Sequence, residues 1–264
     1  MGIDGTWQNE YGSVMTVSMS PDGRIRGRYS STTGSTGTYP LLGWADPRGA
    51  VPDRGQSLAL SISWRSMGPE APDPSWHWVS ALGGQRVGEA DSERLILLHD
   101  MVATVESPGQ ARIGRHLDKL VFSRRADDSR KNIPEFPAAQ PASMPADSTS
   151  ILDGEWGDDF DPAKRLSFRL LDRGYGTLSA MFVIDGLGCE MMGFADVVAE
   201  IEGLPLLALS LSGLNVDAEA ISLSGSLDLS TMVMTLASFC SSGTAPSLSY
   251  TQTRFDQYRL RKMR

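Results

Sequence analysis

The clearest indication of the fold is the segment GQSLALSISW at residues 55–64. Large apolar side chains stand at every second position from Leu58 to Trp64, and serine or alanine fills the positions between them. This alternation predicts an extended strand with one buried face and one open face. Nearly the same stretch returns as LPLLALSLSG at residues 204–213, where Gly213 stands in the place of Trp64.

Three pairs of matching segments indicate that the chain contains one design twice. The segment GTW at 5–7 matches GEW at 154–156, GWAD at 43–46 matches GFAD at 193–196, and LALS at 58–61 matches LALS at 207–210. The offsets, from 5 to 154, from 43 to 193 and from 58 to 207, are 149, 150 and 149 residues. Agreeing offsets in the same order along the chain predict an internal duplication.

The sequence pattern of each half predicts short strands separated by turns. MTVSMSPDGRIRGRYS, residues 15–30, places Pro21, Asp22 and Gly23 between two alternating segments, as in a β-hairpin. Units of short antiparallel strands form either a sandwich or an up-and-down barrel, and the barrel is favoured because closure leaves no exposed sheet edge. We expect barrels at residues 1–124 and 151–264, joined by a linker rich in proline, alanine and serine at 125–150.

The bulk composition excludes several classes of protein. A formal net charge of −8 argues against nucleic acid as a partner, and no apolar run is long enough to span a membrane. The first residues show no secretory signal, and Cys189 and Cys240 lie in apolar segments, which favours buried thiols and a cytoplasmic location. Two cysteines and three scattered histidines lack metal-ligand spacing, and we expect neither a metal nor a cofactor.

The first half resembles the avidin and streptavidin family over residues 3–124. The segments that carry the resemblance are GTWQNEYGS (5–13), DGRIRGRYSS (22–31), YPLLGWAD (39–46), LALSISW (58–64) and KLVFSR (119–124). The resemblance implies an eight-stranded barrel with a ligand mouth at one end. The expected fold is therefore all-β, with two tandem eight-stranded antiparallel up-and-down barrels.

The same resemblance implies a binding site in the N-terminal barrel. Asn9, Ser13 and Tyr29 match the residues that bind the ureido oxygen of biotin, and Trp64 and Trp78 match two aromatic walls. The segment STTGSTG at 31–37 matches the loop that closes over the ligand. The full set of expected ligand-binding residues is Asn9, Tyr11, Ser13, Tyr29, Ser31, Thr33, Ser35, Trp64, Trp76, Trp78 and His99.

Departures from the family pattern predict weakened biotin binding. Trp76 stands where the family has a small hydroxyl residue, and His99 stands where it has a third wall tryptophan. The family's carboxylate falls at Leu120, although Asp118 lies two residues away on the same face. Each lost hydrogen bond to a desolvated ligand group costs about 1–3 kcal/mol.

The second half departs further. Asp158 and Phe182 replace Asn9 and Tyr29, Gly213 replaces Trp64, and Leu223 lies near the position of Trp78. Several methionines add apolar bulk. We expect a degenerate barrel that has lost its polar groups and acts as a built-in partner subunit for the first. The alternative is a second pocket for a larger apolar ligand.

Two functions fit these patterns. The first is a small-molecule binding protein for biotin or a different heterocyclic or apolar ligand, paired barrel to barrel within the chain and able to form a homo-oligomer. The second is a cofactor-free cyclase or isomerase that uses the barrel as a substrate-folding chamber. Its candidate catalytic residues are Tyr29, His99 and Asn9.

Overall fold

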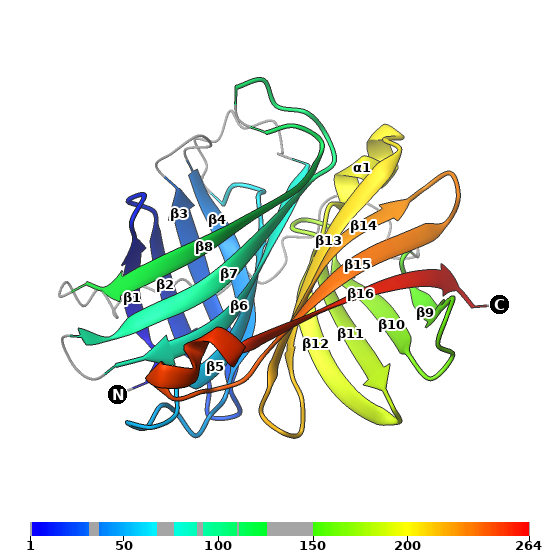
Figure 1. The fold of residues 1–264 in the computed structure, drawn as a ribbon. Helices are drawn as coiled ribbons and strands as arrows, with labels where there is room; N and C mark the ends of the chain where they lie inside the picture. Colours follow the sequence, from blue (N-terminus) through cyan, green and yellow to red (C-terminus); the bar gives the residue numbers. More distant parts are fainter. Residues whose placement is uncertain are drawn as a thin grey trace.

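The computed structural model describes residues 2–31, 37–67, 77–88, 92–109, 111–125 and 150–263. Two closed antiparallel barrels of eight strands each make up these residues, which confirms the expected fold class (Figure 1). Most of the expected linker lies outside the described residues.

The N-terminal barrel follows the chain order, and its last strand pairs with its first. Its strands are β1 (Gly5–Asn9), β2 (Val14–Met19), β3 (Arg24–Ser31), β4 (Gly37–Ala45), β5 (Gln56–Ser63), β6 (Trp78–Val87), β7 (Arg94–Ala103) and β8 (Gly114–Arg124). Each strand pairs antiparallel with the next, so no edge is left open.

The C-terminal barrel repeats this topology. Its strands are β9 (Gly154–Asp158), β10 (Arg165–Asp172), β11 (Thr177–Ile184), β12 (Leu187–Ala195), β13 (Leu206–Leu214), β14 (Ala220–Asp228), β15 (Val233–Ser241) and β16 (Thr253–Lys262). A short helix, α1 (Val197–Glu202), follows β12, and a 3₁₀ helix, η3 (Pro246–Thr251), precedes β16. Within the described chain, no helix is long and apolar enough to cross a membrane.

Matching tryptophans in the first strand of each barrel show how closely the two copies agree. The indole nitrogen of Trp7 donates to the Ile3 carbonyl at 2.9 Å, and that of Trp156 donates to the Leu152 carbonyl at the same distance. Both rings are fully buried. Each ring also lies beneath a cation from the last strand of its own barrel. These tryptophans are structural.

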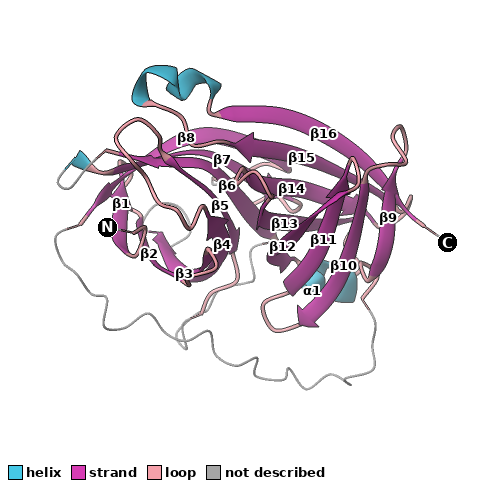
Figure 2. Ribbon diagram, turned by 90° about the horizontal axis from the view of Figure 1, so that it is seen from below, coloured by secondary structure: helices cyan, strands magenta, loops and turns pink. Residues whose placement is uncertain are grey.

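The serine and alanine face of β5 is buried, so the expected open face is wrong. Ser57, Ala59 and Ser61 point away from their own barrel core, yet each is almost completely buried. Strands β4 to β7 pack there against β12 to β15 of the other barrel, as the view from below shows (Figure 2). Small side chains let two sheets approach closely, which explains why both copies contain LALS. Ala208, in the second copy, packs with Val79 and Val102 of the first barrel.

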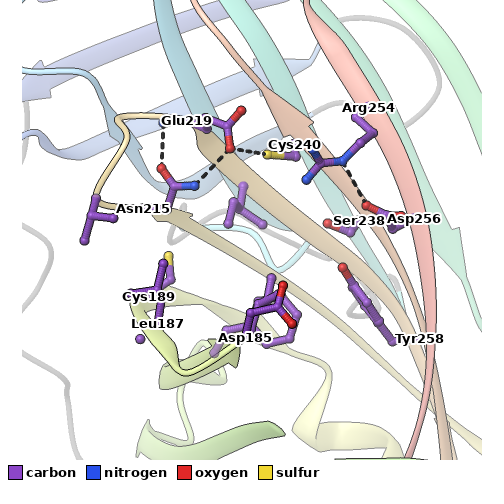
Figure 3. A pocket seen from close by; sticks show the side chains of 15 residues that line it. Asp185, Leu187, Cys189, Asn215, Glu219, Ser238, Cys240, Arg254, Asp256 and Tyr258 are labelled. Atoms are coloured by element: carbon purple, nitrogen blue, oxygen red, sulfur yellow. Dashed lines mark hydrogen bonds and ion pairs between the residues drawn. The ribbon is translucent and has the colours of Figure 1, made fainter. Parts of the chain in front are cut away.

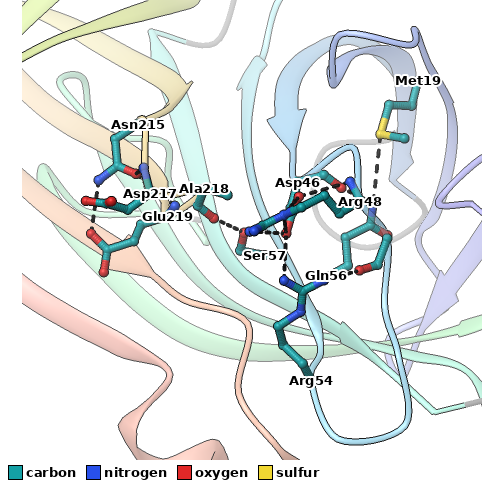
Figure 4. Close-up of polar contacts among 11 residues, drawn as sticks. Met19, Asp46, Arg48, Arg54, Gln56, Ser57, Asn215, Asp217, Ala218 and Glu219 are labelled. Carbon is teal, nitrogen blue, oxygen red and sulfur yellow. Dashed lines mark hydrogen bonds and ion pairs between the residues drawn. The ribbon is translucent and has the colours of Figure 1, made fainter.

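The two barrels lie head to tail. We define the mouth of each barrel as the end where its fifth strand ends, and the floor as the opposite end. His77, at the mouth of the first barrel, bonds through Nδ1 to Oδ2 of Asp196 at the floor of the second, at 2.7 Å. At the opposite end, Ser57 donates to the Ala218 carbonyl at 2.7 Å (Figure 4). The mouths therefore open in opposite directions.

The sheet register corrects the residue equivalences expected from the sequence offsets. Leu58 lies opposite Gly84, and Leu209 lies opposite Gly225. A Cβ on either glycine would lie about 2 Å from a carbonyl of the next strand, at 2.0 Å for Gly84 and 1.9 Å for Gly225, so the two glycines mark the same place. Residue 58 therefore matches residue 209, an offset of 151 rather than 149. Such a slip of two residues leaves every side chain on the same face.

This register changes which residues replace the aromatic walls. Trp64, six residues after Leu58, corresponds to Asn215, while Gly213 corresponds to Ile62. Trp78, six residues before Gly84, corresponds to Glu219 and not to Leu223. The replacement of Tyr29 by Phe182 is confirmed, because Phe182 pairs with Cys189 as Tyr29 pairs with Tyr39.

Candidate functional site

Asn9, Ser13 and Tyr29 meet inside the mouth of the N-terminal barrel, as the resemblance implied. They come from β1, from the turn after it and from β3, and all three are buried. Oδ1 of Asn9 accepts the backbone N–H groups of Tyr11 and Ser13, at 3.1 and 2.9 Å. Because the turn uses this oxygen, the amide nitrogen is the part of Asn9 left to donate to a ligand.

Tyr29 supplies a second donor at the same place. Burial raises the pKa of its phenol, and contacts with Ser13 and Asn9 oppose this effect only in part. The phenol therefore keeps its proton near neutral pH. Together with the Ser13 hydroxyl, the site offers hydrogen-bond donors from three residues, an arrangement that suits a carbonyl oxygen.

Trp64 forms the centre of an aromatic cluster beside these donors. Its ring centroid lies 4.8 Å from that of Tyr39, 5.9 Å from that of Tyr29 and 6.2 Å from that of Trp78. The indole of Trp78 donates to the Val105 carbonyl at 3.2 Å. Tyr39 was missed by the sequence reasoning, although its place opposite Tyr29 on the inward face of the next strand was a usable signal.

A hydrogen-bonded chain joins Trp64 to His99. The indole Nε1 of Trp64 donates to Oγ of Ser80 at 2.8 Å, and the same Oγ lies 2.8 Å from Nε2 of His99. Since an indole can only donate, the Ser80 proton is free to bond Nε2, which then accepts as part of a neutral imidazole. Desolvation lowers the pKa of His99 to about 4, against smaller opposing effects from Asp100 and Asp118.

The low pKa of His99 makes the stability of the protein depend on pH. Between pH 7 and pH 5 the unfolded chain takes up a proton at this residue and the folded barrel does not. The free energy of unfolding should therefore fall by about 2 kcal/mol over this range because of His99. Urea unfolding at both pH values should show this loss in the wild type and in the exposed-site control His116→Gln, but not in His99→Gln. An equal loss of unfolding free energy between pH 7 and pH 5 in all three proteins would contradict this prediction.

A carboxylate, Asp118, lies at the rim of the mouth. Tyr11 is 52% exposed, and its hydroxyl donates to Oδ2 of Asp118 at 3.1 Å. Leu120, at the position of the family's carboxylate, is buried and apolar. Ser31 is buried at the end of β3.

Three expected residues, Thr33, Ser35 and Trp76, lie outside the described residues. The side chains of the other two histidines are engaged elsewhere. His77 bonds to Asp196 of the second barrel, and His116 bonds to the Arg112 carbonyl at the surface. No group of three or more potential metal ligands occurs among the residues that the structure describes.

The C-terminal barrel contains a cavity of about 140 Å³ at its mouth (Figure 3). The expectation that this barrel had simply lost its polar groups is wrong, because a different polar set surrounds the cavity. The polar lining residues are Asp185, Asn215, Glu219, Ser238, Arg254, Asp256 and Tyr258. Both cysteines, Cys189 and Cys240, are buried free thiols beside it, and burial raises the pKa of each to about 12.

The fold and the N-terminal site define an up-and-down barrel with a mouth built for a small ligand. Residues 1–118, which include most of the N-terminal barrel, match the model of the avidin family. The C-terminal barrel repeats the topology outside the matched residues, so the chain is a tandem of two avidin-like barrels. Family and fold together support a small-molecule binding protein.

Proposed function

We propose that the N-terminal barrel binds a small heterocyclic ligand through a ring carbonyl, with biotin or a biotin-like molecule as the ligand class. The observation that carries this proposal is the convergence of Asn9, Ser13 and Tyr29 beside Trp64. Donors bind the carbonyl oxygen, and the aromatic cluster packs on the apolar part of the ring.

The same geometry favours moderate affinity for biotin over extreme affinity. The ureido N–H groups of biotin need acceptors opposite the three donors. Leu120 is apolar, Asp118 is held at the rim by Tyr11, and Nε2 of His99 is engaged by Ser80. Each unmet N–H group costs about 1–3 kcal/mol, so a ring carbonyl with fewer N–H groups suits the site better than a cyclic urea.

The environment of His99 supports binding over acid-assisted cyclisation. With a pKa of about 4, His99 has no proton to give near neutral pH. The raised pKa of Tyr29 likewise keeps its proton on the phenol. Tyr29 can therefore act by donating a hydrogen bond to a bound ligand, and His99 by holding Ser80 and Trp64 in place, without a proton-transfer step.

A substitution taken from the second barrel tests the proposal. Asp158 occupies the place of Asn9, and its Oδ1 accepts the N–H groups of Phe160 and Asp161, so aspartate is compatible with the turn. Asn9→Asp should therefore keep the fold but present an oxygen where the ligand carbonyl needs a donor. In calorimetry we expect biotin to bind the wild type with a micromolar or weaker Kd, and Asn9→Asp to weaken it at least tenfold.

Tyr29→Phe should weaken biotin binding about tenfold, because it removes one hydrogen bond, and a tenfold change in Kd corresponds to about 1.4 kcal/mol. Tyr250→Phe removes the same hydroxyl from an exposed position on η3 and serves as the matched control. The proposal is wrong if millimolar biotin gives no heat, or if Asn9→Asp binds biotin as the wild type does.

A further inference from the structure

We propose that the C-terminal barrel has a binding site of its own, which takes a small organic cation: an amine carried on an apolar body about the size of a benzene ring. The site is the cavity at the mouth of this barrel. It lies at the other end of the molecule from the site proposed above, and it takes a different chemical class.

The cavity occupies the same place in its barrel as the N-terminal site does. The register matches the main residues of the two sites, pairing Trp64 with Asn215, Trp78 with Glu219, His99 with Ser238, Asp118 with Asp256 and Leu120 with Tyr258. The two wall tryptophans are thus replaced by Asn215 and Glu219, and the aromatic Tyr258 stands where the first barrel has Leu120. This is a rearranged site and not a filled one.

Glu219 is a fixed carboxylate at this cavity. Asn215 Nδ2 donates to Oε2 at 3.0 Å, Cys240 Sγ lies 3.4 Å from the same oxygen, and Ser242 Oγ donates to Oε1 at 2.9 Å. Burial alone would raise the pKa of Glu219, but these donors and, to a smaller extent, the charge of Arg254 outweigh it and hold the pKa below its usual value. Since a carboxylate offers about four acceptor positions, one stays available to a ligand.

The balance of charge at the cavity favours a cation. Asp185, Glu219 and Asp256 carry three negative charges, and Arg254 carries one positive charge. The side chain of Arg254 is 68% exposed and its Nε lies 3.3 Å from Oδ2 of Asp256, so it is paired at the surface. An anion would meet this excess of negative charge, whereas an ammonium group gains from it.

The remaining lining suits an apolar ring. Phe182 and Tyr258 meet edge to face, with centroids 5.3 Å apart. A cavity of about 140 Å³ is close to the roughly 150 Å³ that accepts benzene in an engineered protein. Aromatic faces also attract an ammonium group. Phe182 lacks the hydroxyl of Tyr29, so a carbonyl ligand loses that donor in this barrel.

The mouth is both open and preorganised. A two-residue turn, Asp185 and Gly186 with φ of 51° and 79°, connects β11 to β12, where the first barrel has the segment 31–37. The turn that holds Asn215 and Glu219 is anchored to the first barrel, because Ser57 donates to the Ala218 carbonyl (Figure 4). A fixed carboxylate costs less to order on binding than a mobile one.

Three probes of similar shape and different charge test the proposal on the full chain: 2-phenylethylamine, 2-phenylethanol and 3-phenylpropanoate. In calorimetry or NMR titration we expect the amine to bind at least tenfold more tightly than the alcohol, and the carboxylate to bind most weakly. Stronger binding by the carboxylate, or no binding of the amine at millimolar concentration, overturns the proposal.

Two substitutions with opposite expected effects separate binding from folding. Glu219→Gln should weaken the amine at least tenfold, while Arg254→Gln should tighten it several-fold, a gain that a damaged fold does not produce. Asp217→Asn, an exposed change on the same turn, should alter affinity little. Unchanged affinity in both Glu219→Gln and Arg254→Gln overturns the proposal. Asn9→Asp, which alters only the N-terminal site, should leave amine binding unchanged. A negative result for biotin at that site can therefore be distinguished from a negative result for the amine at the C-terminal cavity.

Discussion

Replacing Glu93 with alanine should lower the free energy of unfolding of the N-terminal barrel by about 4 kcal/mol. Glu93 and Arg86 are both almost fully buried and form an ion pair inside this barrel. Burial lowers the pKa of Arg86, which reflects the cost of its charge in this environment. Without Glu93, the guanidinium keeps its bond from Nε to Gln56 at 2.9 Å but loses its counter-ion. An uncompensated buried charge is among the most destabilising defects in a folded protein.

The double variant Arg86→Met/Glu93→Leu is the control for this effect. It removes both charges, so most of the lost stability should return. The second partner of Glu93, Arg124, still donates to the carbonyls of Asp4 and Gly2, at 2.6 and 2.8 Å.

Urea unfolding followed by tryptophan fluorescence suits this measurement, because five of the six tryptophans lie within residues 1–124. A loss below about 1 kcal/mol in Glu93→Ala, or a double variant as unstable as the single one, would show that the pair is dispensable.

The sequence predicted the barrels well because alternation and turn residues depend on local chemistry. It could not predict the register of β13. Leucines at 207, 209 and 211 look alike at every second position, so a shift of two residues keeps the inward face leucine-rich. Only the strand pairing, marked by Gly84 and Gly225, fixes the choice. The serine face of β5 was misread for a related reason: small polar residues suit solvent and a close sheet-to-sheet contact equally.

The sites were predictable to different degrees. Asn9, Ser13, Tyr29 and Trp64 lie together, as their match to a family pattern implied. Ser80 was not predicted, because a single serine in a strand has no signal until Trp64 and His99 are placed around it. The cavity of the C-terminal barrel depends on residues between β11 and β16, whose convergence requires the corrected register.

Replacing Arg115 with alanine should lower the free energy of unfolding by about 3 kcal/mol, because Arg115 neutralises a carboxylate that is buried between the two barrels. Asp100 points outward from β7 and is completely buried where the barrels meet. Its carboxylate is bonded by the guanidinium of Arg115 and by the hydroxyl of Ser224 in the other barrel. Removing Arg115 leaves the charge with one neutral partner in the middle of the contact surface.

Arg112→Ala is the matched control, since Arg112 is an exposed arginine three residues away. It should cost less than about 0.5 kcal/mol. Asp100→Asn in the Arg115→Ala background should recover part of the loss, because the amide removes the buried charge while keeping an oxygen for Ser224. If Arg115→Ala costs no more than Arg112→Ala, water reaches Asp100 and the contact between the barrels is looser than its buried serines and alanines indicate. A large loss that Asp100→Asn relieves would show instead that the charge of Asp100, held by groups from both barrels, couples their stabilities.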